Sequence, residues 1–169
     1  DPAELPTLIG RFPVTWVDVD GLGDAELLRA IASQFDIHAL ALEDVVSLHH
    51  RAKVEEYSGH VFIVARMVDF DTAIQTEQLN IFVGEGFVLT FQERPGDSLD
   101  PVRERIRTGR GKVRSAGADY LAYALVDAAL DGYFPALERL SERIGAIEDE
   151  VVGHATSATV KHIYEVKRY

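Results

Sequence analysis

The sequence contains no cysteine, so the chain forms no disulfide, no thiolate metal site and no thiol nucleophile. Basic residues are also scarce. The 17 lysines and arginines stand against 28 aspartates and glutamates, which gives a formal net charge of −11. This balance argues against a nucleic-acid-binding protein, which normally carries a basic surface. An acidic surface attracts cations instead.

Long apolar runs and familiar catalytic motifs are absent as well. No uninterrupted apolar stretch approaches the roughly 18 residues that a membrane span requires. The sequence has no Gly-x-Gly-x-x-Gly fingerprint, no Walker lysine loop and no Gly-x-Ser-x-Gly elbow. We therefore do not expect an enzyme.

Apolar residues make up 47% of the chain, which is enough for a buried core. β-Branched and aromatic runs predict strands, and helical spacing behind an N-cap such as Asp24 predicts helices. Four predicted strands follow one another closely, which indicates an antiparallel meander and not repeated βαβ units. We expect strands over 14–19, 52–57, 60–70, 75–84 and 87–93, and helices over 25–35, 38–46 and within 96–109.

The sequence changes character at Ala118, and nearly everything from there to residue 152 has a helical pattern. Pro135 interrupts this run, a hinge follows over 153–157, and a last helix is expected to start near Thr159. We predict an α/β fold in which a mixed, largely antiparallel sheet over residues 1–117 lies under helices, followed by a helical arm over 118–169. A heptad seam that calls for a partner helix is formed by Leu137, Leu140, Ile144, Ile147 and Val151.

Three acids stand in apolar surroundings. Glu43 and Asp44 are neighbours on a predicted helix, where adjacent side chains point about 100° apart. They are either part of a solvated helix face or surface oxygen ligands for a hard cation such as Mg²⁺. Asp127 lies among leucines, alanines and valines, so it is paired, hydrogen-bonded, cation-bound or neutral, or it lies at the wet edge of its helix.

Other polar clusters give weaker signals. His49 and His50 are adjacent, which makes a poor chelate, and no His-x-x-x-His pattern accompanies them, so we do not expect a zinc site there. The basic island over 103–114 is either a solvated helix face, a partner for acids of a neighbouring helix, or an anion site.

Several strings taken together resemble the cytoplasmic N-terminal domain of the CorA family of divalent-cation channels. They are IHALALEDVVSLHHRAKVEEY, VFIVARM, LTFQERPGDSLDPVRERIR and ADYLAYALVDAALDGYFPALERL, in the family's order and spacing. The resemblance covers nearly the whole chain. One departure is Ala52, which stands where the family usually has proline.

The resemblance implies an α/β/α sandwich, a helical arm and the start of a stalk helix that enters the inner (plasma) membrane, with this domain facing the cytoplasm. It also implies a homopentamer, which without the stalk is expected to be a monomer or dimer. Asp44 matches the family's regulatory metal-site acid at the subunit boundary. Glu43 and Asp127 match acids of a second nearby metal position, whose partner acid lies beyond Tyr169. The expected ion is Mg²⁺, with Co²⁺, Ni²⁺ or Zn²⁺ as alternatives.

Three other interpretations remain. One is the zinc-transporting branch of the same superfamily, and another is a free-standing metal-binding or adaptor domain. The third is a metal-dependent hydrolase that uses Glu43, Asp44 and His49, which would require a concave pocket. Because the helical pattern stops at Tyr169 without a cap, we expect the natural chain to be longer.

Overall fold

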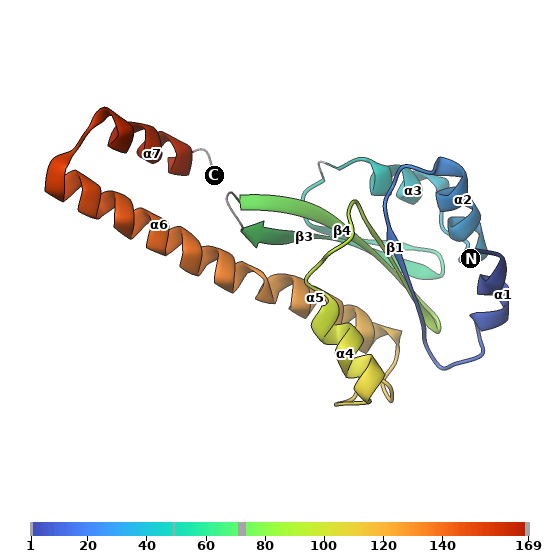
Figure 1. Cartoon of the computed structure of the whole chain (residues 1–169). Helices are drawn as coiled ribbons and strands as arrows, with labels where there is room; N and C mark the ends of the chain where they lie inside the picture. Colours follow the sequence, from blue (N-terminus) through green and yellow to red (C-terminus); the bar gives the residue numbers. More distant parts are fainter. Residues whose placement is uncertain (1, 49, 71–73, 168–169) are drawn as a thin grey trace.

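A five-stranded mixed sheet forms the centre of the structure, a computed structural model that describes residues 2–48, 50–70 and 74–167 (Figure 1). The strand order is β1-β5-β4-β3-β2, with β1 parallel to β5 and the other neighbouring strands antiparallel. The predicted antiparallel meander of β2 to β5 is therefore confirmed, and β1 pairs with β5, the last strand of this meander. The strands are β1 (Thr15–Asp20), β2 (Lys53–Tyr57), β3 (His60–Phe70), β4 (Ile74–Gly84) and β5 (Phe87–Gln92).

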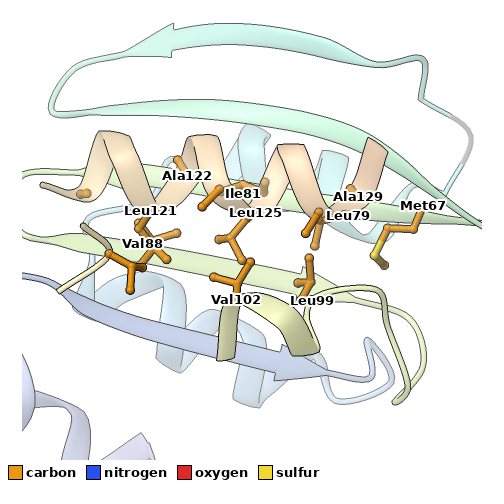
Figure 2. Close-up of a cluster of buried hydrophobic side chains, with 14 residues drawn as sticks. Met67, Leu79, Ile81, Val88, Leu99, Val102, Leu121, Ala122, Leu125 and Ala129 are labelled. Atoms are coloured by element: carbon orange, nitrogen blue, oxygen red, sulfur yellow. The ribbon is translucent and has the colours of Figure 1, made fainter. Parts of the chain in front are cut away.

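Helices cover both faces of the sheet, which confirms the α/β/α arrangement. On one face, α1, α2 and α3 pack over Phe62 and Phe82, whose rings stack with centroids 4.5 Å apart. On the other face, α4 and α5 pack over Leu79 and Ile81 (Figure 2). The helices are η1 (Pro2–Glu4), α1 (Leu5–Leu8), α2 (Ala25–Gln34), α3 (Ala39–Val46), α4 (Asp100–Thr108), α5 (Ala118–Asp131), α6 (Tyr133–His154) and α7 (Ser157–Lys167).

The ends of the helices follow local sequence signals. Asp24 Oδ1 accepts hydrogen bonds from the backbone amides of Glu26 and Leu27, which caps α2. His38 Nδ1 accepts from the backbone amide of Leu40 at 3.2 Å and caps α3. Gly109 ends α4 with a φ of 68°, a left-handed conformation that glycine adopts without steric cost.

The long helical run of the sequence is split between two helices at Gly132. α5 lies on the sheet and buries small alanines, whereas α6 leaves the sheet as an arm along which α7 folds back (Figure 1). Part of the heptad seam stays uncovered in this chain, since Leu137, Ile144 and Val151 are 56%, 41% and 48% exposed. The division of the chain into units 1–117 and 118–169 stays a prediction.

None of the helices in the described ranges is both long and apolar enough to cross a membrane.

The core on the α5 side yields a matched pair of leucine variants. Leu125 is fully buried, whereas Leu130 on the same helix is 57% exposed. We expect Leu125→Ala to lower the free energy of unfolding by about 3 kcal/mol, because it removes buried methyl groups and leaves a cavity. Leu130→Ala should cost less than about 1 kcal/mol. Urea denaturation followed by circular dichroism measures both, and equal losses would contradict this packing.

Candidate metal sites

Asp44 lies near the end of α3, next to the edge strand β2, and its side chain is 26% exposed. Its carboxylate accepts a hydrogen bond of 2.6 Å from Lys53 Nζ, and His50 Nε2 lies 3.3 Å from its other oxygen. Lys53 also donates to Glu55 Oε1 at 2.9 Å. The hydrogen bond with Asp44 raises the pKa of Lys53 above its ordinary value against the opposing effect of burial. Asp44 is thus an accessible acid that already has an ammonium partner.

A fully buried amide holds this region in place from below. Gln78 of β4 donates from Nε2 to the backbone oxygen of Asp44 at 3.2 Å, and its Oε1 accepts from the backbone amide of His50 at 3.3 Å. The same Nε2 donates to Asn80 Oδ1 at 2.8 Å. The position of Asp44 is therefore fixed by the sheet as well as by α3, a role that the sequence analysis missed.

Among the described residues, the other two predicted metal-site acids do not converge with Asp44 in one group. Glu43 is exposed on α3, whereas the partly exposed Asp127 belongs to α5, which packs on the opposite face of the sheet. Within the described residues, these three acids do not form a group that could share one ion. Their joint use in metal sites at a subunit boundary stays a prediction. His49, named for the rival hydrolase, lies outside the described residues.

A group of acids that the sequence analysis did not single out is formed by Asp18, Asp20 and Asp97. Asp18 and Asp20 lie at the end of β1, beside Thr90 and Gln92 of the parallel strand β5. One oxygen from each of the three acids lies within 4.8 Å of the others. The available signals were the Asp-x-Asp spacing at a strand end and an aspartate just before a helix.

Arg103 of α4 connects two of these acids. Its Nη2 hydrogen-bonds to Asp18 Oδ2 and, at 2.5 Å, to Asp97 Oδ2, while Nη1 donates to Asp97 Oδ1 at 2.6 Å. The two carboxylates raise the pKa of the guanidinium. Burial acts to raise the pKa of Asp97, but hydrogen bonds from Arg103, Gln92 and the Leu99 amide lower it overall. Among the alternatives given for the basic island over 103–114, pairing with acids is therefore the one that Arg103 follows. These acids lie on a strand and in a loop, and not on a neighbouring helix.

The chain thus combines three features: a net negative charge, a partly exposed carboxylate at the sheet edge, and a helical arm with an uncovered apolar seam. The sequence model of the family described as "CorA-like Mg²⁺ transporter protein" matches residues 13–169. This chain belongs to the CorA family.

Individual relatives agree with this match. The chain is 40% identical over 157 residues to the cobalt/magnesium transport protein CorA of Thermotoga maritima, covering 91% of this chain and 45% of that protein. It is 33% identical over 146 residues to the magnesium transporter ALR1 of Saccharomyces cerevisiae, covering 84% of this chain and 17% of that protein. The chain therefore spans less than half the length of these two relatives.

Solved structures show the same fold. The soluble domain of CorA from Methanocaldococcus jannaschii superposes with a TM-score of 0.76 at 18% identity, covering 93% of this chain and 64% of that one. The cytoplasmic domain of ZntB from Vibrio parahaemolyticus gives a TM-score of 0.68 at 13% identity, with the same coverage of both chains. At these identities the likeness concerns the fold alone.

The pairing of Arg103 with Asp97 predicts a pH-dependent contribution to stability. Asp97 has a side chain that is only 1% exposed. Arg103→Gln leaves this carboxylate without its main partner and should lower the free energy of unfolding at neutral pH by about 3 kcal/mol. Because the pKa of Asp97 is lowered in the folded state, its ionisation stabilises the fold above about pH 4, and this contribution is lost as the pH falls through the lowered pKa.

The difference between the wild-type chain and Arg103→Gln should therefore narrow on acidification. Urea denaturation at a series of pH values between about 7 and 3 measures this dependence. Arg107→Gln is the matched control, since Arg107 is exposed on the same helix, and it should change stability by less than about 0.5 kcal/mol at every pH. A pH-independent difference for Arg103→Gln would show that Asp97 is not the group concerned.

Proposed function

We propose that this chain is the cytoplasmic Mg²⁺-sensing domain of a CorA-type magnesium/cobalt channel whose remaining chain lies in the inner (plasma) membrane. The observation that carries the proposal is the position of Asp44, the acid that matches the family's regulatory site. It lies on the surface at the sheet edge, is 26% exposed, and is held by Lys53 and by the backbone contact from Gln78. Membership of the CorA family supplies the context of divalent-cation transport.

The proposed mechanism uses the repulsion between acidic subunits. At high cytoplasmic Mg²⁺, one ion bridges Asp44 to a carboxylate of an adjacent subunit. In a second position, another ion bridges Glu43 and Asp127 to a carboxylate of an adjacent subunit. The ring of subunits then stays closed. When Mg²⁺ falls, the acidic surfaces repel one another and the ring loosens. A net charge of −11 per chain makes this repulsion substantial. The ion shifts the equilibrium only by its difference in affinity for the two states.

The helical arm supports assembly into a homopentamer. Leu137, Ile144 and Val151 recur at heptad spacing on α6 and remain 41–56% exposed although α7 packs against α6. Such a seam gains stability by burying its apolar side chains against another helix. In the proposed pentamer, the stalk helices of this and neighbouring subunits supply that surface.

Magnesium and cobalt are favoured over zinc as the ions handled. Partly hydrated carboxylate sites suit Mg²⁺, and the chain contains no cysteine with which to bind a softer metal. The relative that is 40% identical is named a cobalt/magnesium transport protein, whereas the likeness to ZntB is one of fold. Transport explains the surface acids without a catalytic role, so we propose no enzymatic activity.

Removal of the Asp44 charge tests the sensing role in the full-length channel. We expect Asp44→Asn to raise the Mg²⁺ concentration that half-inhibits ion flux by at least about tenfold, because Mg²⁺ affinity in oxygen sites follows the ligand charge. The isosteric amide keeps a group that can accept from Lys53. Flux into proteoliposomes at a series of internal Mg²⁺ concentrations measures the shift. Glu26→Ala, which removes an exposed acid of α2, is the control and should leave inhibition unchanged.

Lys53 supplies a test in the opposite direction. Its ammonium lies 2.6 Å from Asp44 Oδ2, so it competes with a bound cation for the same oxygen. Lys53→Met keeps an apolar stem near the Phe62 ring and removes the positive charge. The attraction between two opposite unit charges 4 Å apart is about 1 kcal/mol even in water, so this is the least that a bound cation would gain. Half-inhibition should therefore occur at about fivefold lower Mg²⁺ in the same flux assay. Equal inhibition of Lys53→Met and the wild-type channel would remove Asp44 from the sensing mechanism.

A further inference from the structure

The helix that carries Glu43 and Asp44 begins with a histidine, where the usual cap is Ser, Thr, Asp or Asn. His38 lies in extended backbone (φ −63°, ψ 139°), and its Nδ1 accepts a hydrogen bond from the backbone amide of Leu40 at 3.2 Å. A ring nitrogen accepts a hydrogen bond only while it carries no proton. A charged imidazole is also unfavourable at the positive end of a helix dipole. The cap of α3 therefore requires His38 to be neutral.

α3 depends on this cap because it has little stability of its own. It has eight residues, fewer than the roughly 12–15 that an isolated helix needs. Ala41 and Val45 are fully buried against the sheet layer, whereas Leu40 and Val46 are 62% and 47% exposed. Few apolar contacts thus hold the first turn, so loss of the cap loosens it.

A column of aromatic rings connects the cap to the hairpin of β2 and β3. The ring of His38 stacks on Tyr57 with centroids 6.1 Å apart, and Tyr57 stacks on His60 at 5.2 Å. On its other side, His60 meets the edge of Phe82 at 5.6 Å. His60 is only 6% exposed, and its buried Nε2 has no hydrogen-bond partner among the described residues. A proton on this ring would bury a positive charge, which is costly, so His60 is neutral as well.

The groups that act on the charge of His60 come from the loop before α3 and from β2. Burial lowers the pKa of His60 below its ordinary value of 6.5, Asp36 acts to raise it, and His38 acts to lower it. Tyr57 donates to Glu55 Oε2 at 3.2 Å, and burial raises the pKa of this phenol, so it stays neutral in acid. The stabilising contribution of neutral His60 is complete above about pH 6.5 and is lost as the pH falls through its lowered pKa.

We propose that His38 and His60 form a pH-sensitive switch that holds α3 in place while both imidazoles are neutral. Protonation of His38 removes the cap of α3, and protonation of His60 places a charge in the ring column that joins this cap to the hairpin. Histidine is the side chain that ordinarily changes its charge between pH 5 and 8. Because α3 carries Asp44, acidification of the cytoplasm weakens inhibition by Mg²⁺. This last consequence rests on the proposed function, whereas the switch itself does not.

The variant His38→Asn tests the switch in the 169-residue chain, because an asparagine side chain caps a helix at neutral and at acidic pH. Thermal unfolding is followed by circular dichroism at about pH 7.5 and about pH 5.5, a range that includes the titration of histidine. The melting temperature of the variant relative to the wild-type chain should be about 2–4 °C higher at the acidic pH than at the neutral pH. A difference that is the same at both pH values would overturn the switch, because a merely structural role of His38 does not depend on pH.

Two further variants assign the pH dependence to these rings. His60→Phe keeps a ring between Tyr57 and Phe82 and removes the ionisable group, so it should also melt less differently at the two pH values than the wild-type chain does. His154→Asn removes an exposed histidine of α6 and should retain the pH dependence of the wild-type chain. An unchanged pH dependence in the double variant His38→Asn/His60→Phe would assign the acid effect to other groups and overturn the proposal.

The consequence for sensing is measured in the full-length channel. The Mg²⁺ concentration that half-inhibits flux should rise about threefold between about pH 7.5 and about pH 6 in the wild-type channel, and by less in His38→Asn. His50, which lies beside Asp44, is present in both channels, so its contribution cancels. Equal responses to pH in both channels would overturn the link from α3 to Asp44. Unchanged inhibition in Asp44→Asn would instead overturn the proposed function and leave the melting results of the switch in force.

Discussion

Burial of both faces of one sheet is the constraint on which the rest of this structure depends. Along β4, Leu79 and Ile81 point to the α5 layer, while Phe82 points to the α3 layer. Helices must therefore cover each face, and a carboxylate carried by a strand reaches water most readily at a sheet edge or a strand end. Asp20 ends β1, and Asp44 of α3 lies beside the edge strand β2.

Polar groups that do lie inside this framework fix the positions of the acids. Gln78 is fully buried in β4 and holds the backbone on both sides of the loop after α3 through Asp44 and His50. Arg103 holds Asp97 in the same way on the other face. An unpaired buried polar group costs about twice what a net hydrogen bond contributes, so each contact disfavours the alternative positions more than it adds stability. Contacts within the chain thereby hold these carboxylates in position.

The local parts of this architecture were predictable from the sequence, and the non-local parts were not. The cap by Asp24 depends on residues within one turn of each other, so spacing alone reveals it. The interruption that the sequence analysis placed at Pro135 lies at Gly132, and α6 continues through Pro135. The meander follows from short turns. The network of Asp18 with Arg103 joins residues 85 positions apart through the parallel pairing of β1 and β5, which no local pattern encodes. Glu43, Asp44 and Asp127 were named through a family resemblance, and the contact of Asp44 with Lys53 became visible only in the structure.

That contact bears on how a sensor for an abundant ion would be tuned. A carboxylate free of partners binds Mg²⁺ more tightly than one that must first give up an ammonium at 2.6 Å. Lys53 is in turn shared with Glu55, so its charge remains compensated when Asp44 turns to a metal ion. In the proposed mechanism the internal ion pair and the bridging ion are therefore alternatives for the same oxygen. The Mg²⁺ concentration at which the ring closes then depends on the difference between two comparable interactions. This difference is small, so closure requires a high ion concentration and is reversible.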